Sequence, residues 1–459
     1  MSAFDKTKIF YRAENVSKSY VFVSIDRLTF SALYDKIPVA YYSKYFLERK
    51  LILMKYIQET AKQIPVAGEY DVVVAGGGVA GIAAALAAAR RGAKTLLIEK
   101  QFALGGLATL GLVTIYLPLC DGCGRQVSFG ICEELIKLSV KHGIEAKRES
   151  YMAWQTGSDE DKKENRYRVR FNAQLFAILA EQQLREDGAE ILLGTSVCDT
   201  VVNDGRVEAL IIENKSGRQA ILAKSVVDCT GDADIFHLAG ARCALFGQGN
   251  VLAAWHYSIE NGAVRLHMMG PADLSDEEKK VKRRDKGDGL YEERFHLVDR
   301  RFSGVEGGEL SEMMQLSHDK MLEGFLDRGD LSDSHFFATM PTIPQVRMTR
   351  RPVGKYEMDI SDDHKHFEDS IGMVGNWKKK GPIYEVPYRA LIGDLKNVIA
   401  AGRCISNTDA MWEIMRVIPC CAVTGEAAGV AAAMGCDLDT LDVSALQKKL
   451  VENGVVLHI

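Results

Sequence analysis

The sequence predicts an α/β fold built on a parallel sheet, and three observations support this prediction. A short apolar run rich in β-branched residues, Val72–Ala75, is followed by a glycine turn and an alanine-rich stretch. A second strand pattern ends at Glu99. Near the end of the chain, a strand, a loop and another alanine-rich helix pattern occupy Asn397–Met434. Alternating strand and helix patterns of this kind are typical of parallel sheets.

The glycine turn has the spacing of a dinucleotide-binding turn. Gly76 allows the tight turn, Gly78 lets the backbone approach a pyrophosphate, and Gly81 lets the helix pack closely on the strand. The N–H groups at the start of the helix would then face the phosphates. A carboxylate at Glu99, at the end of the second strand, suits a ribose diol and repels a 2′-phosphate. We therefore expect the ADP half of FAD or NAD, and not NADP.

Size and composition exclude several classes of protein. The chain has 459 residues, of which 47% are hydrophobic, so it is long enough for two or three domains of an ordinary enzyme. A net charge of −5 makes nucleic acid an unexpected partner. No apolar stretch is long enough to cross a bilayer, and no signal peptide is evident. Ten scattered cysteines favour a reducing cytoplasm.

The chain divides into four segments by composition. Residues 1–53 are rich in tyrosine and phenylalanine and read as an N-terminal extension or arm. We hypothesise that the natural product begins at Met54. Residues 54–244 form the first part of the nucleotide-binding domain, and residues 391–459 form its C-terminal part. The glycine fingerprints stop between them, so residues 245–390 are expected to be an inserted lobe that binds substrate.

Several elements follow the second strand. Asn172 is a fair N-cap for a helical pattern. Strand patterns cover Glu190–Leu193 and Arg206–Ile212, and Asn203–Gly205 between them is a hairpin-turn signal. A further strand is expected over Lys224–Asp228.

Further fingerprints identify a family resemblance. They are Leu104–Thr109, Val227–Asp234, Val398–Ser406 and Arg416–Gly429. In this order they resemble the FAD-dependent oxidoreductase family, distant kin of the flavoprotein subunits of succinate dehydrogenase and fumarate reductase. The resemblance covers roughly residues 54–440. It implies a Rossmann-like FAD-binding domain with a parallel sheet, discontinuous in sequence, and an inserted α+β substrate lobe.

The resemblance also implies which residues contact FAD. The glycine turn and Glu99 would hold the pyrophosphate and the adenosine ribose, and Val197 would meet the adenine through its backbone. The helix entered at Pro419 would aim its N-terminus at the flavin pyrimidine ring and stabilise the anion formed on reduction. The expected cofactor-binding residues are Gly76, Gly78, Val79, Ala80, Gly81, Glu99, Lys100, Gly105, Gly106, Thr109, Val197, Thr230, Gly231, Asp232, Gly402, Arg403, Val417 and Pro419.

Hydride chemistry at flavin N5 needs a base for the accompanying proton and often a cation for an oxyanion. Arg416 is the first choice for an anion contact, because it directly precedes the flavin-facing segment. Glu413 lies three residues before it, so the two could instead form an ion pair on one helix face. His256 and Arg389 are the remaining catalytic candidates, although a lone histidine on a strand is more often structural.

Two alternatives stay open. Cys120 and Cys123 could form a redox disulfide beside the flavin, which would make the protein a thiol or disulfide oxidoreductase. They could also be half of a zinc or iron–sulfur site, although we favour no metal. The second alternative is an FAD-binding electron-relay subunit of a complex. Arg403 replaces the acidic residue that disulfide-reductase relatives carry there, which weakens the resemblance to those enzymes.

Only one complete Gly-x-Gly-x-x-Gly fingerprint is visible, so no dedicated NAD(P)H domain is expected. Electrons would then come from a small-molecule substrate or from an electron-transfer partner. A homo-oligomer is possible on general grounds alone.

Overall fold

The computed structural model describes residues 57–158, 160–161, 168–270, 284–285, 290–293, 296–329, 331–435 and 437–459. The chain divides into two compact units, Met1–Gln63 and Ile64–Ile459. The second unit holds all the elements discussed below. The N-terminal segment 1–53, including its proposed end before Met54, lies outside the described residues.

A mostly parallel sheet forms the centre of the second unit. Its strand order is β5-β2-β1-β8-β7-β6, and one further strand, β18, pairs with β8. Strands β5, β2, β1, β8 and β18 run parallel, whereas β7 and β6 extend the sheet in antiparallel fashion. The strands are β1 (Val66–Ala75), β2 (Thr95–Ile98), β5 (Glu190–Leu192), β6 (Ser196–Asn203), β7 (Arg206–Asn214), β8 (Gly217–Asp228) and β18 (Val398–Ala400). The predicted α/β class is confirmed.

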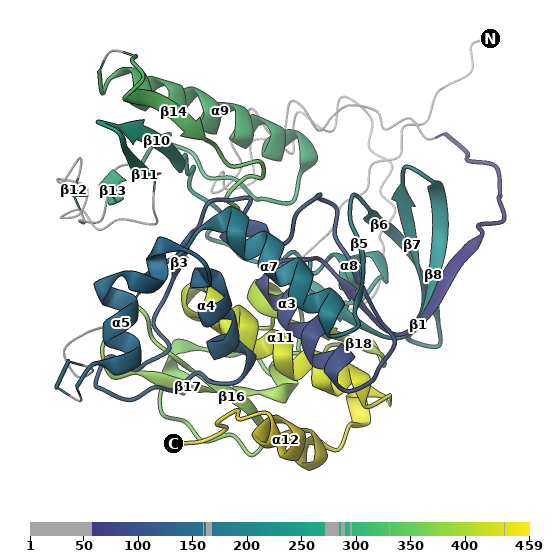
Figure 1. Cartoon of the computed structure of the whole chain (residues 1–459). Coiled ribbons are helices and arrows are strands. Elements are labelled where there is room, and N and C mark those ends of the chain that lie inside the picture. The colour runs from purple at the N-terminus through teal and green to yellow at the C-terminus, as the bar shows by residue number, and fades with distance from the viewer. Residues whose placement is uncertain are drawn as a thin grey trace, which may run out of the picture. The chain divides into compact units, whose positions relative to one another are not determined.

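Two alanine-rich helices, α3 (Val79–Arg90) and α11 (Ile418–Ala433), lie side by side at the centre of this unit (Figure 1). Their backbones approach closely because glycines of α11 face α3. A Cβ added to Gly425 would lie 2.3 Å from the Ala80 carbonyl oxygen, and one added to Gly429 would lie 2.2 Å from that of Ala84. The two glycines therefore bring the first and last parts of the nucleotide-binding domain together.

We expect Gly429→Val to destabilise the protein by about 3 kcal/mol, because the new side chain would force α11 away from α3. Chemical denaturation of purified protein measures this. Gly308→Ala is the control, since a Cβ at Gly308 meets nothing within 4 Å and alanine favours a helix. Equal stability of the two variants would contradict the close approach.

The elements between the strands agree with their sequence signals. The Asn172 side chain accepts a hydrogen bond from the Leu175 N–H at 3.1 Å and caps α7 (Ala173–Glu186). The β6–β7 hairpin turns at Asp204 and Gly205, whose φ values of 45° and 72° are both in the left-handed region. That conformation explains the turn residues found there.

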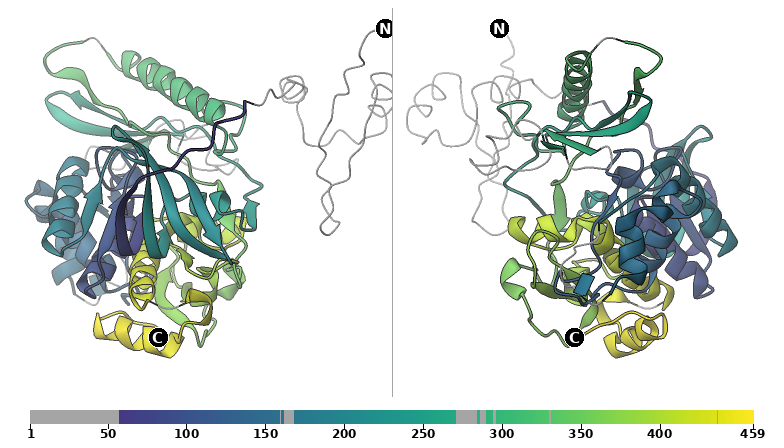
Figure 2. Two further views of the ribbon diagram at one scale, coloured as in Figure 1. Left: turned by 90° about the vertical axis from the view of Figure 1, so that its right-hand side faces the viewer. Right: turned by 60° about the vertical axis from the view of Figure 1, so that its left-hand side comes forward.

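A second, smaller sheet with one long helix forms a cap lobe. Strands β10 (His256–Glu260), β11 (Ala263–Met269) and β14 (His335–Thr339) pair in antiparallel fashion, and α9 (Gly307–Leu326) lies beside them. Figure 2 shows this helix and these strands together at one end of the second unit. Strands β12 (Arg284–Asp285) and β13 (Leu290–Glu293) complete the sheet.

The expected lobe 245–390 does not pack as a single body. Strands β16 (Ser370–Gly375) and β17 (Ile383–Pro387) pair with each other, and β16 packs against α11. Ile371 and Val374 of β16 and Tyr384 and Val386 of β17 belong to the main hydrophobic core. The other elements named in Figure 1 are α4 (Ile131–Val140), α5 (Glu149–Thr156), α8 (Asp234–Leu238), β3 (Ile115–Tyr116) and α12 (Val443–Glu452).

Within the described residues, no single helix is long and apolar enough to cross a membrane. Only α10 (Asp409–Met415) and α11 counted together reach that length, and they are bent by 87°.

Candidate functional site: a cofactor cleft

A cleft of about 610 Å³ opens where the parallel strands end. Ala75 at the end of β1, Ile98 at the end of β2, Cys229 just after β8 and Ala401 just after β18 all line it. The carboxyl ends of parallel strands are where open α/β sheets bind ligands. The cleft also borders the cap lobe, because residues of α9 and of the segment after β14 line its outer part.

Of the residues that the sequence assigns to the cofactor, most line this cleft. They are Gly76, Gly78, Val79, Ala80, Glu99, Lys100, Gly105, Gly106, Val197, Thr230, Gly231, Asp232, Gly402 and Arg403. The structure places the other four outside the lining, behind the wall: Gly81, Thr109, Val417 and Pro419.

The glycine turn has the shape that a pyrophosphate requires. Gly76 has a φ of 99°, which side chains rarely adopt. A Cβ on Gly81 would lie 1.8 Å from the Gly76 carbonyl oxygen, so Gly81 allows the helix to pack on the turn and does not itself face the cleft. Nothing lies within 4 Å of a Cβ placed on Gly78. The backbone at Gly78 is therefore open to a ligand.

Glu99 is buried at the end of β2 and lines the cleft. One carboxylate oxygen accepts a hydrogen bond from the Gly77 N–H at 2.6 Å, and the other accepts one from the Gln101 N–H at 2.8 Å. These two bonds fix the carboxylate beside the glycine turn. Each oxygen keeps acceptor capacity that a ribose hydroxyl can use.

The Gly105–Gly106 loop also lines the cleft and lies directly against the glycine turn. The Gly105 N–H donates to the Gly77 carbonyl at 2.8 Å. Thr109 lies behind this loop, where its hydroxyl donates to the Leu104 carbonyl at 2.5 Å. Thr109 thus holds the loop in place and does not reach the cleft.

Arg403 joins the loop after β8, which contains Gly231 and Asp232, to the cap lobe. Its guanidinium donates to the Gly231 carbonyl at 2.7 Å, contacts the Asp232 carboxylate, and donates to the Val346 carbonyl of the cap side. Asp228 also stabilises this loop, because its carboxylate accepts a hydrogen bond from the Thr230 hydroxyl at 2.6 Å. Burial raises the pKa of Asp228 to about 6.

The positively charged side chain of Arg416 lines the same cleft. It caps the C-terminus of α10 and lines the cleft beside Ile418 and Cys421. Among the described residues, its buried Nε has no hydrogen-bond partner. Its guanidinium lies 5.1 Å from the centre of the Trp412 ring. Burial lowers the pKa of Arg416 to about 10, so the group stays charged at neutral pH.

The N-terminus of α11 opens onto the cleft beside Arg416. Ile418 and Cys421 in its first turn line the cleft, while Val417 and Pro419 are buried behind them. Val417 is the N-cap residue and Pro419 occupies the first turn, where a missing N–H costs nothing. The two residues shape the helix start, and neither is among the residues that line the cleft.

The structure does not bring the other catalytic candidates to the cleft. Glu413 pairs with Lys378 and not with Arg416. Arg389 is exposed and pairs with Asp369 at 2.9 Å. Neither Glu413 nor Arg389 lines the cleft, so the structure does not support the catalytic roles expected for them.

His256 is also displaced from the cleft, because it lies in the interior of the cap lobe. It is fully buried, stacks on His267 at 4.8 Å between ring centres, and contacts Arg328 at 2.7 Å through Nε2. Burial, together with the nearby Arg328 charge, lowers the pKa of His256 to about 3. Its place inside the cap lobe, away from the residues that line the cleft, gives no support to the expected acid–base role.

Cys120 and Cys123 lie outside the cleft lining as reduced thiols. Two other cysteines line the cleft, Cys229 and Cys421. Burial raises the pKa of Cys421 to about 12, so it is a protonated thiol at neutral pH.

Sequence reasoning missed the outer wall of the cleft. Much of this wall is apolar and comes from α9 and from the segment between β14 and β15 (Arg350–Pro352); it includes Leu310, Met314, Ile343, Pro344 and Val346. No local motif marks these residues, because their role depends on how the cap lobe folds over the sheet. Only the amphipathic pattern of α9 could have suggested one apolar face.

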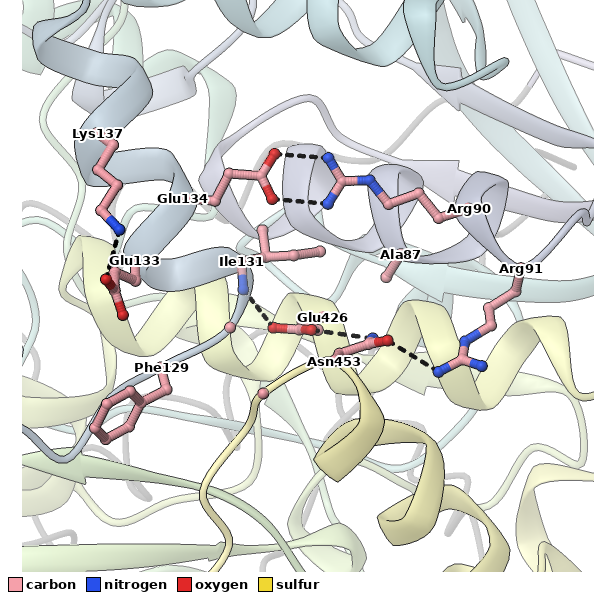
Figure 3. A pocket seen from close by; sticks show the side chains of 12 residues that line it. Ala87, Arg90, Arg91, Phe129, Ile131, Glu133, Glu134, Lys137, Glu426 and Asn453 are labelled. Atoms are coloured by element: carbon pink, nitrogen blue, oxygen red, sulfur yellow. Dashed lines mark hydrogen bonds and ion pairs between the residues drawn. The ribbon is translucent and has the colours of Figure 1, made fainter.

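A second cavity, of about 640 Å³, lies on another side of α11 (Figure 3). Buried Glu426 projects into the space where three elements meet. Its carboxylate accepts from the Ile131 N–H of α4 at 2.7 Å and from the Asn453 amide at 3.2 Å. Arg91 in turn donates to the Asn453 side chain at 3.0 Å, which Figure 3 also shows. Glu426 thereby ties α4 and the end of α12 to α11.

The residues of the first cleft fit FAD on three structural grounds. The backbone at Gly78 is open for a pyrophosphate, and Glu99 is fixed where a ribose would lie. The buried Nε of Arg416 lacks a partner at the other end. When bound, FAD supplies hydride chemistry at its N5 atom.

The chain belongs to the FAD-dependent oxidoreductase family. It matches that family over residues 71–304 and 260–450, which together take in most of the chain. This match confirms the resemblance read from the fingerprints. It also supports FAD as the cofactor of this chain.

Among curated proteins, the chain is 36% identical to a thioredoxin reductase of Ureaplasma parvum over 77 residues, which cover 17% of this chain and 25% of that protein. It is 25% identical to a digeranylgeranylglycerophospholipid reductase of Thermoplasma volcanium over 205 residues, covering 42% and 47%. The chain thus spans a quarter to a half of these relatives. A flavocytochrome c3 fumarate reductase structure is 14% identical with a TM-score of 0.37, covering 81% of this chain and 79% of that one.

The Glu426 carboxyl makes the stability of the protein depend on pH. Burial raises the pKa of Glu426 to about 7, so the folded state holds a proton that the unfolded state releases near pH 4.5. The free energy of unfolding should therefore fall as the pH rises from about 5 to 8, by about 3 kcal/mol for this group alone.

Glu426→Gln removes this titration. We expect its free energy of unfolding to change less between pH 5 and pH 8 than that of the wild type, as measured by denaturant titration at each pH. Glu323→Gln is the control, because that carboxylate is exposed on α9 and pairs with Lys320 at the surface. Parallel pH profiles for the wild type and Glu426→Gln would contradict the assignment.

Proposed function

We propose that the protein transfers a hydride between flavin N5 and a small polar substrate, and that Arg416 binds an anionic oxygen of that substrate. The position of Arg416 carries this proposal. It is a charged group in the cleft, next to the α11 N-terminus, and its Nε has no partner among the described residues. Such a group is stabilised when an oxyanion or carboxylate binds to it.

The residues of the outer wall indicate which groups the rest of the substrate would carry. The α9 residues Leu310 and Met314 offer apolar contact on this wall, while Ser311 and Thr342 offer hydroxyl groups. A small molecule with one anionic end and a compact neutral body fits these surroundings. The apolar wall would also exclude water, which strengthens the interaction between Arg416 and an anion.

The chain's own residues divide the remaining work. Glu99 and the glycine turn would orient the adenosine end, and Arg403 would hold the Gly231–Asp232 loop closed over the nucleotide. The partial positive charge of the α11 N-terminus would favour negative charge on the flavin ring. Because only one dinucleotide fingerprint is visible, we propose that electrons come from the substrate or from an electron-transfer partner, and not from a bound nicotinamide.

The first test is the role of Arg416. We expect Arg416→Met to slow anaerobic reduction of the bound flavin by about 10- to 100-fold, since a hydrogen bond to a charged group contributes about 1.5–3 kcal/mol. A panel of hydroxy acids, amino acids and neutral alcohols supplies the substrates, and the bleaching of flavin absorbance is the measurement. Arg416→Lys should recover part of the rate.

Arg242→Met is the matched control, because Arg242 is exposed at the surface and pairs with Asp394. Its flavin content and reduction rate should equal those of the wild type. If Arg416→Met binds FAD normally and is reduced at the wild-type rate by every substrate, Arg416 does not bind the substrate.

A second test concerns the cysteine pair. We expect the double variant Cys120→Ser, Cys123→Ser to keep the wild-type rate of flavin reduction and reoxidation, because both residues lie outside the cleft lining. Stopped-flow measurement with disulfide and small-molecule acceptors compares the two proteins. A loss of disulfide turnover in this variant would revive the thiol–disulfide alternative.

A further inference from the structure

Two histidines and a glutamate converge at a place remote in sequence from the cofactor fingerprints. His366 lies in the loop before β16, Glu385 lies in β17, and His458 follows α12. Nδ1 of His366 lies 3.4 Å from the Glu385 carboxylate, and Nδ1 of His458 lies 3.0 Å from the same oxygen. One ligand atom from each residue falls within 4.8 Å of the other two.

We propose that His366, Glu385 and His458 bind a divalent transition-metal ion, with Zn²⁺ as the best fit. Zinc binds imidazole nitrogen and carboxylate oxygen at about 2.0–2.2 Å, so two ligand atoms of a tetrahedral site lie about 3.3 Å apart. The two nitrogen–oxygen distances, 3.4 Å and 3.0 Å, lie on either side of that value. Small side-chain rotations would complete the site.

The carboxylate is already fixed for this role. Glu385 is only 7% exposed, and its second oxygen accepts a hydrogen bond from the Phe367 N–H at 2.7 Å. That bond leaves the first oxygen facing both imidazoles. Hydrogen bonds from neighbouring groups orient metal ligands in the same way in known sites. A buried carboxylate facing two imidazoles also supplies the negative charge that a cation needs.

The two histidines are held by the backbone beside them. Phe367, next to His366, is buried in the main core. Leu457, next to His458, accepts a hydrogen bond at its carbonyl from the Ser370 hydroxyl at 2.7 Å. The imidazole rings lie 4.6 Å apart between centres. The fold therefore brings the backbone of all three ligands together, and the two partly exposed imidazoles already face the fixed carboxylate.

The donor set determines which ions should bind. Two imidazole nitrogens and one carboxylate oxygen suit Zn²⁺, Ni²⁺ or Cu²⁺, whereas Mg²⁺ and Ca²⁺ prefer oxygen alone. Three protein ligands leave a fourth position for water. A bound ion would join β17, the loop before β16 and the chain beyond α12, so it would stabilise the packing of these segments on the main core.

Calorimetric titration tests the proposal on full-length protein treated with a chelator and then freed of it. We expect one Zn²⁺ per chain in the wild type and no binding of Mg²⁺. His366→Ala and His458→Ala should each weaken Zn²⁺ binding by about tenfold or more, because each removes a direct ligand. Glu385→Gln should weaken it as well.

His364→Ala is the matched control, since His364 is an exposed histidine of the same loop that pairs with Asp363 at 2.7 Å. Its Zn²⁺ affinity should equal that of the wild type. Thermal unfolding gives a second readout, in which Zn²⁺ raises the melting temperature of the wild type and of His364→Ala, but not of His366→Ala or His458→Ala. FAD content and far-UV circular dichroism check that each variant folds.

Two results would overturn the proposal. One is a titration in which the wild-type protein does not bind one Zn²⁺ per chain. The other is binding that persists unchanged in the double variant His366→Ala, His458→Ala, which would show that zinc binds elsewhere on the chain. Both results are independent of flavin activity, so they do not depend on the proposed function.

Discussion

The close approach of three backbone segments is the constraint on which the rest of the structure depends. The glycine turn after β1 meets the start of α3, and α11 lies directly against α3. At Gly81, Gly425 and Gly429, a side chain would collide with a carbonyl oxygen of the neighbouring segment. The cleft exists because these segments can approach without side chains between them. The carboxyl ends of the strands are then left open for a nucleotide.

The same contact explains why the domain can be discontinuous in sequence. α3 belongs to the first part of the chain and α11 to the last, yet they share one hydrophobic core. The chain between the two helices can form a separate lobe, provided that it re-enters the central sheet at β18. The cap lobe does so, and it contributes the outer wall of the cleft without disturbing the sheet.

The nucleotide half of the site could be read from the sequence because its signals are local. Gly76 has a left-handed backbone conformation that other residues rarely adopt, Gly78 leaves the backbone open, and Glu99 follows a strand directly. Gly81 and Thr109 were assigned to the cofactor, yet they act one layer behind it. A sequence spacing does not distinguish a residue that touches a ligand from one that supports its neighbour.

Among the catalytic candidates, the sequence favoured Arg416, which lines the cleft, but it could not place the other three residues. Glu413 and Arg416 are three residues apart, but α10 ends between them and sends Arg416 into the cleft while Glu413 meets Lys378. His256 has the residue type of an acid–base catalyst, but the cap sheet buries it. These outcomes depend on contacts between segments remote in sequence. The residues Leu310 and Met314 were missed for the same reason.

The hydrogen bonds of Arg403 have a consequence for how ligands enter and leave the cleft. One guanidinium donates to the Gly231 carbonyl of the loop after β8 and, at the same time, to the Val346 carbonyl of the outer wall. Moving either segment away from the cleft would break a hydrogen bond of this one side chain. Under the proposed function, the exchange of the cofactor and the width of the substrate entrance would therefore be coupled through Arg403.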